Sequence, residues 1–181
     1  MELLKSSAFA TGVFFGLLIV VLIVRFANRN KKIKTEYDER QQIIRGKSYT
    51  YACYTLAAYE FIMTFLSMGG ILESIPIEYY NFHLFGIYIG GIVLAVHSIW
   101  NGAYWGLNNN IKRYTVVFII LFLINLMPVV LTIINGVKTI NGIIMFPFVN
   151  AACLLLFVAL GIALIARKRL DDRMKEEEDC A

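Results

Sequence analysis

One acidic side chain interrupts a long apolar stretch of this chain. Glu60 is the single charged residue between Ser48 and Gly70. The small and polar residues that share its helical face are Cys53, Ala57, Thr64 and Ser67. A charged carboxylate in apolar surroundings costs several kcal/mol when it is unpaired. We therefore expect Glu60 to face other helices, where it either binds a proton, a cation or a substrate, or only ties helices together.

His97 is the expected partner of Glu60, directly or through a water molecule. Helical spacing places it on one face of its segment with Gly86, Gly90 and Asn101. A carboxylate and an imidazole can relay protons, but a histidine in such a segment can also be a packed, hydrogen-bonded side chain. Both interpretations remain open at this point.

Further polar side chains complete a candidate intramembrane site. Asn125 is expected at nearly the depth of Glu60, close to Pro128, which removes a backbone donor and bends a helix. Bent helices with asparagines can line a cavity, although they are also common in bundles that transport nothing. The site candidates are Glu60, Thr64, His97, Asn101 and Asn125.

Signatures of enzymes and metal sites are absent from the sequence. There is no Walker loop, no His-Glu-x-x-His, no Gly-x-Ser-x-Gly and no Cys-x-x-Cys. The three cysteines are far apart, which fits neither a disulfide framework nor a metal site. We therefore predict a non-enzymatic protein with no catalytic residue, no bound metal and no cofactor.

The elements that must position these residues are membrane helices. Of 181 residues, 59% are hydrophobic and only 17% are charged, which is too little charge for a soluble domain of this size. Apolar runs long enough to cross a bilayer are predicted at about 6–27, 48–70, 83–105, 114–134 and 141–166. The predicted fold is an all-α polytopic membrane helix bundle with five transmembrane helices.

Basic residues give the predicted orientation. Fifteen of the 17 Lys and Arg fall on one side of the five spans, and only Lys5 and Lys138 fall on the other. Since positive charge marks cytoplasmic loops, we expect the N-terminus outside and the C-terminus in the cytoplasm. The first run is interpreted as a retained anchor rather than a cleaved signal peptide. The net charge of +4 thus reflects topology and not a nucleic-acid partner.

Small residues predict where helices pack closely. Gly12 and Gly16 share a face of the first predicted span, and Gly86 and Gly90 share a face of the third. Glycines at this spacing let helix backbones approach. The face of the first span could equally form the seam of a homo-oligomer, because sequence does not say which helix meets which.

The segment 28–47 and the tail 167–181 are the charged cytoplasmic parts. We expect a short amphipathic helix in 28–47, capped by Thr35-x-x-Asp38 and hinged at Gly46, that lies on anionic lipids. The acidic tail is expected to be a solvated helix, or to dock weakly on the basic loop or a partner. A charge cluster is predicted at Asp38, Glu39, Arg40 and Arg45.

One segment resembles a known group of proteins. Tyr37-Asp38-Glu39-Arg40-Gln41, followed by Arg45-Gly46-Lys47-x-Tyr49, is similar to a segment of uncharacterised small integral membrane proteins of bacteria. In those proteins it also leads directly into a membrane span. The resemblance implies a multi-pass protein of the bacterial plasma membrane and carries no established activity.

Two hypotheses for function follow. The first is an accessory, regulatory or structural subunit of a membrane assembly, whose partners are the lipid bilayer and another membrane protein or a second copy. The alternative is a small ion- or proton-coupled transporter with a polar path around Glu60 and His97.

Overall fold

The computed structural model describes residues 36–107 and 111–179, together with Leu18, Leu22 and Arg25. The chain divides into two compact units, Met1–Glu36 and Tyr37–Ala181. In the first unit, Leu18, Leu22 and Arg25 are helical and exposed, and Glu36 is exposed but not helical. The predicted packing glycines Gly12 and Gly16 lie outside the described residues, so the account below concerns the second unit.

Helix α2 spans Glu39–Met68 and begins with a capping box. The Gln41 backbone N–H donates to Asp38 Oδ1 over 2.6 Å, and the Gln41 side chain accepts from the Asp38 backbone N–H. Residues 36–38 are not helical, so the cap predicted at Thr35-x-x-Asp38 is wrong. The hinge predicted at Gly46 is also wrong, because one glycine costs only about 1 kcal/mol and cannot break a long, packed helix. The segment 39–47 is therefore part of α2 and not a separate surface helix.

Helix α3 spans Tyr79–Trp100 and returns antiparallel to α2 after the short 3-10 helix η1, Leu72–Ser74. It begins four residues before the predicted span of 83–105 and ends five residues earlier. Gly86 and Gly90 both face α2: a methyl group at Gly90 would lie 3.4 Å from the Ala52 carbonyl oxygen. The two helices form the most extensive contact in this unit.

Helices α4, Ile111–Ile134, and α5, Phe148–Asp179, are joined by a β-hairpin that we did not predict. Strands β1, Lys138–Ile140, and β2, Ile143–Met145, pair across a two-residue turn at Asn141 and Gly142. Both turn residues have positive φ, 51° and 82°, which an Asn-Gly pair adopts easily. The predicted span of 141–166 therefore starts at Phe148, and its helix continues through the charged tail.

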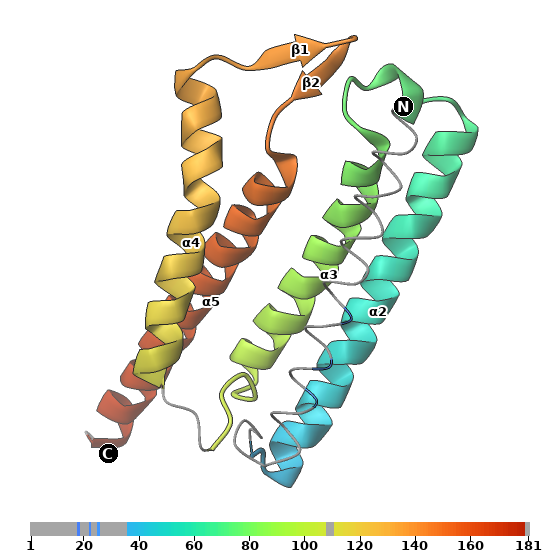
Figure 1. Ribbon diagram of the computed structural model, residues 1–181. Coiled ribbons are helices and arrows are strands. Elements are labelled where there is room, and N and C mark those ends of the chain that lie inside the picture. Colours follow the sequence, from blue (N-terminus) through green and yellow to red (C-terminus); the bar gives the residue numbers. More distant parts are fainter. Residues whose placement is uncertain (1–17, 19–21, 23–24, 26–35, 108–110, 180–181) are drawn as a thin grey trace. The chain divides into compact units, whose positions relative to one another are not determined.

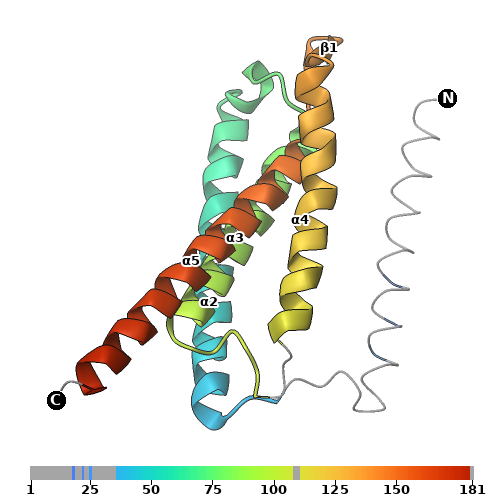
Figure 2. The same cartoon turned by 90° about the vertical axis from the view of Figure 1, so that its left-hand side faces the viewer.

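The helices pack in the order α2, α3, α5, α4. Helix α3 contacts α2 and α5, and α5 crosses obliquely to contact α4 as well (Figures 1 and 2). The core lies between α3 and α5, where Ala95, Ile99, Leu160 and Ala163 are buried. At the hairpin end, the Ile144 backbone N–H donates to the Pro76 carbonyl oxygen over 2.9 Å, which links the two helical hairpins.

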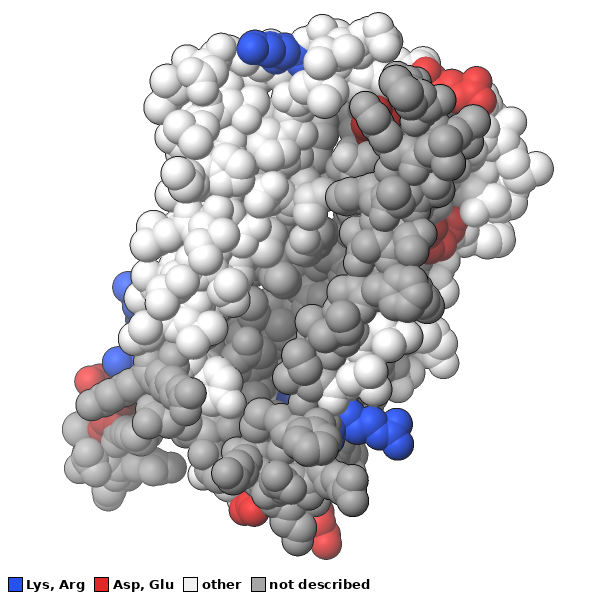
Figure 3. Space-filling model, in the orientation of Figure 1, with Lys and Arg blue, Asp and Glu red and all other residues white. Residues whose placement is uncertain are grey.

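Three of the four described helices are long and apolar enough to cross a membrane: Tyr79–Trp100, Tyr114–Ile134 and Phe148–Met174. Helix α2, which contains the predicted span 48–70, has 30 residues but is not among these candidates. On the face seen in Figure 3, Lys and Arg lie toward the ends of the helices, with few charged residues between them. The part of the chain that the structure describes is thus mostly helical and fits a membrane protein.

Candidate functional site

Glu60 pairs with His83 and not with His97. The His83 Nδ1 atom lies 2.8 Å from Glu60 Oε2, which joins the outer half of α2 to the first turns of α3. Here and below, the end of the α2–α3 pair near Tyr79 is called the outer end, and the end near Trp100 the inner end. His97 lies 14 residues further along α3, or about 21 Å, so it belongs to a different cluster.

The unexpected start of α3 explains the change of partner. With a helix beginning at His83, that histidine would lie at the border of the span, and His97 would be the titratable group closest in depth to Glu60. The helix actually begins at Tyr79, one turn earlier, which carries His83 inward to the level of Glu60. Glu78 precedes the helix without a side-chain capping bond, so no capping signal marks this start in the sequence.

The Glu60–His83 pair is held in place by close packing around Gly86. A methyl group at Gly86 would lie 2.6 Å from Tyr59 Cδ1 and 3.1 Å from Glu60 Oε1. The Tyr59 hydroxyl donates to the Phe82 carbonyl oxygen over 2.7 Å. Because Gly86 has no side chain, Tyr59 and Glu60 can pack directly against the backbone of α3.

The face of α2 that carries Glu60 is open in the structure. The side chains of Glu60 and His83 are 37% and 48% exposed. Cys53, Ala57 and Thr64 are exposed on the same face. Glu60 thus faces another helix, as expected, through His83 and Gly86 of α3, whereas the other residues of this face are not covered by the described part of the chain. We call this surface the α2 polar face, defined by Cys53, Ala57, Glu60 and Thr64.

His97 belongs to a buried polar cluster at the inner end. Its Nδ1 atom lies 2.8 Å from Ser48 Oγ, and the Ser98 hydroxyl donates to the same oxygen over 3.0 Å. Ser48 Oγ also lies 2.9 Å from the Ile44 carbonyl oxygen and donates to it. Ser48 is 0% and Ser98 1% exposed. We call Ser48, His97 and Ser98 the inner cluster.

Other contacts complete the inner end. Asn101 donates through Nδ2 to the His97 carbonyl oxygen over 2.8 Å, which caps α3 rather than opening a path. The Gln41 Nε2 group donates to the carbonyl oxygens of Gly102 and Trp105 over 3.1 and 3.2 Å. Among the described residues, no buried side-chain nitrogen or oxygen lacks a hydrogen-bond partner.

Of the two remaining site candidates, Asn125 lies elsewhere and Thr64 lies on the α2 polar face. Asn125 on α4 accepts a 3.1 Å hydrogen bond from Asn150 Nδ2 on α5 and donates to the Leu121 carbonyl oxygen. Thr64 donates to the Glu60 carbonyl oxygen, one turn back in its own helix. The five predicted site residues are therefore distributed over three places and do not converge on one pocket.

The predicted charge cluster has separate local roles. Asp38 caps α2. Glu39 is the acidic residue of the first helical turn, where its negative charge interacts favourably with the helix dipole. Arg45 lies over the Tyr37 ring, 4.2 Å from its centroid, and donates to the Tyr49 hydroxyl. Arg40 is exposed.

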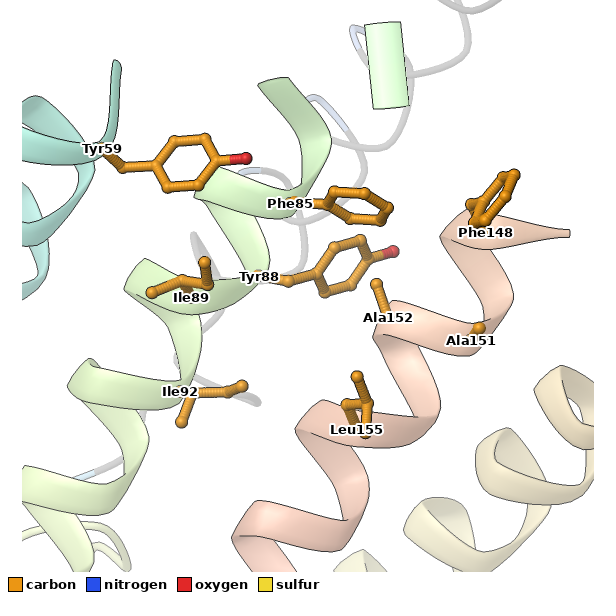
Figure 4. Close-up of a pocket in the computed structure, with 9 residues that line it drawn as sticks. All are labelled: Tyr59, Phe85, Tyr88, Ile89, Ile92, Phe148, Ala151, Ala152 and Leu155. Atoms are coloured by element: carbon orange, nitrogen blue, oxygen red, sulfur yellow. The ribbon is translucent and has the colours of Figure 1, made fainter. Parts of the chain in front are cut away.

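A cavity of about 390 Å³ opens between α3 and α5, but its walls are apolar (Figure 4). Phe85, Tyr88 and Ile92 come from α3, and Phe148 and Leu155 from α5. None of the five candidate polar residues lines it. Within the described residues there is also no group of three side chains that could hold a metal ion.

Comparison with known proteins adds no relative. No protein-family model matches the chain, and neither does a curated protein or a solved structure.

Proposed function

We propose that this chain is a non-enzymatic, multi-pass protein of the bacterial plasma membrane that serves as an accessory, regulatory or structural subunit of a membrane assembly. The proposal includes five spans, an outer N-terminus and a cytoplasmic C-terminus. The alternating directions of α2 to α5 support this topology, because Arg40, Arg45, Lys47 and Arg167 then share one end and Lys138 lies at the other.

The observation that carries the subunit proposal is the open position of the Glu60–His83 pair. Glu60 lies eight residues before the end of α2, about 12 Å along the helix and therefore at hydrocarbon depth in the proposed topology. Charged and strongly polar side chains at that depth avoid lipid. The Glu60–His83 pair, together with Thr64 beside it on α2, thus requires a protein surface to cover it.

Site-directed photo-crosslinking tests this proposal. A benzophenone amino acid in place of Ala57 lies on the α2 polar face, and the same group in place of Ile124 provides a control on α4, where the side chain is 59% exposed. In native membranes, we expect a discrete protein adduct from position 57 and mainly lipid adducts from position 124. Glu60→Gln should reduce the adduct at 57 several-fold.

Two outcomes would contradict the subunit proposal. If position 57 crosslinks only to lipid, the polar face has no protein cover. If the crosslink joins residue 57 to the segment 1–36 of the same chain, the cover is internal, and the proposal loses the observation on which it rests.

A proton-coupled carrier is the second candidate, favoured by an accessible carboxylate–imidazole pair. Its polar path would involve Glu60 and His83, since His97 is occupied in the inner cluster. In proteoliposomes, a carrier should lose proton-linked flux in Glu60→Gln and in His83→Gln. Equal flux in both variants and in the unaltered protein would exclude this function.

A further inference from the structure

A second cavity lies at the inner end, where α3 and α5 meet the start of α4. Its volume is about 490 Å³, within the range of small-molecule sites. Ile99 and Leu164 form an apolar floor that continues into the core between α3 and α5. Tyr104 and Trp105 form an aromatic wall, and their rings pack edge to face with centroids 4.8 Å apart.

The rim of this cavity is basic. Arg167 and Lys168 line it, together with Asp171. Arg167 donates through Nη1 to the Trp100 carbonyl oxygen over 3.1 Å and through Nη2 to Asp171 Oδ1 over 2.9 Å. A guanidinium has five N–H donors, so these two bonds fix its position and leave capacity for another acceptor. Lys168 is exposed beside it.

This combination matches one class of ligand. A phosphate group is favoured by an arginine fixed in place beside a lysine, and an acyl chain by the apolar floor. Trp and Tyr side chains are typical of the boundary between hydrocarbon and headgroups. Asp171 offsets one of the two positive charges, so the rim is weakly cationic and suits a single negative charge.

We propose that this cavity binds an anionic phospholipid, with its phosphate at Arg167 and Lys168 and its acyl chain against Ile99 and Leu164. The inference rests on the proposed membrane topology, which places this end of the helices at the cytoplasmic headgroup layer. Basic pockets between membrane helices on that side are a known setting for such lipids.

Tryptophan quenching in lipid vesicles tests the site directly. The chain has two tryptophans, so Trp100→Phe leaves Trp105, in the cavity wall, as the single fluorophore of the full-length protein. The protein is reconstituted in phosphatidylcholine vesicles with increasing fractions of brominated phosphatidylglycerol. We expect quenching that saturates at a low fraction, and Lys168→Gln should raise the fraction needed about five-fold.

Controls separate a lipid site from general surface charge and from a phosphate ion site. Arg169→Gln removes a neighbouring exposed charge that does not line the cavity and should change the required fraction less than two-fold. Brominated phosphatidylcholine should quench in proportion to its content, without saturation. Excess inorganic phosphate should leave the quenching by brominated phosphatidylglycerol unchanged.

The proposal is overturned by any of three results. These are equal quenching by the two brominated lipids, equal effects of Lys168→Gln and Arg169→Gln, or reversal of quenching by inorganic phosphate. Each can occur whether or not a protein covers the α2 polar face, because the purified chain alone is used. Failure here and failure of the subunit proposal are therefore distinguishable.

Discussion

The two ends of the α2–α3 pair differ in how far their polar side chains are buried and hydrogen-bonded within the chain. At the inner end, Ser48 and Ser98 are 0% and 1% exposed, and every group of the cluster has a partner within the chain. At the outer end, Glu60 and His83 have each other, yet 37% and 48% of their side chains remain exposed. The inner cluster is complete, whereas the outer pair has one open side.

This difference separates stabilising polar groups from groups available for an interaction. A buried, fully bonded cluster specifies how two helices align and has nothing left to offer a ligand. An ion pair with an open side contributes little to the stability of the isolated chain. We therefore expect substitutions at the inner end to affect folding and substitutions at the outer pair to affect association.

The largest expected loss of stability comes from Gly86→Leu, because the larger side chain would disrupt the packing of α2 on α3 at the outer end. The new side chain would occupy the space of Tyr59 and of the Glu60 carboxylate. Overpacking of this kind should reduce the free energy of unfolding by about 3 kcal/mol. The unfolding midpoint in detergent, followed by circular dichroism, measures it.

Gly46→Ala is the matched control for that measurement. A methyl group there meets nothing within 4 Å, and alanine favours a helix, so stability should rise by up to about 1 kcal/mol. Equal losses in both variants would show that Gly86 has no special packing role.

The next effect is that of Ser48→Ala at the inner end. The substitution leaves His97 Nδ1 and the buried Ser98 hydroxyl without their shared partner. We expect a loss of about 2 kcal/mol in the free energy of unfolding. Thr50→Ala removes an exposed hydroxyl that bonds only within its own helix and should cost much less. A similar loss in both would contradict the distinction between the two ends.

A smaller effect is expected for Glu60→Gln in the purified chain. Because the pair is partly exposed, its loss should change the free energy of unfolding by less than about 1 kcal/mol. The same variant should nevertheless reduce photo-crosslinking at position 57 in native membranes. A large loss of stability without any loss of crosslinking would assign the pair a structural role.

The smallest effect concerns Tyr104, near the inner end and beyond the last residue of α3. Burial raises the pKa of its phenol above the ordinary 10.0, with a further contribution from the nearby Tyr37. The unfolded chain then ionises first, so stability should fall as pH rises above 10. Tyr104→Phe should reduce this alkaline loss, as pH-dependent unfolding can show. An unchanged alkaline loss would mean that Tyr104 ionises as easily in the folded chain.

Sequence alone predicts the helices well and their exact alignment poorly. Uncharged apolar runs leave helices as the economical choice, and Gly86 marks a close approach by its lack of a side chain. The partner of Glu60, however, depends on where α3 begins, and the uncapped start at Tyr79 gives no local signal. Placing the start of α3 one helical turn too late makes His97, rather than His83, the expected partner of Glu60.

Two other differences had signals in the sequence. The pair Asn141-Gly142 is a strong indicator of a two-residue hairpin, but its strands are only three residues long and lack a clear alternation. Asp38 and Gln41 have the spacing of a capping box, and this start makes Gly46 an interior residue of α2. By contrast, no sequence pattern says that Cys53, Ala57 and Thr64, which share a face with Glu60, lie outside the contact between α2 and α3.

The unbroken course of α5 has a mechanical consequence. The helix continues for 12 residues beyond Arg167, about 18 Å, without a break between its apolar part and its charged end. If α5 tilts by about 10° at Arg167, its C-terminal end moves by about 3 Å, because the helix beyond that residue is about 18 Å long. The backbone of α5 could thus transmit small rearrangements among the apolar helices to whatever meets its acidic end.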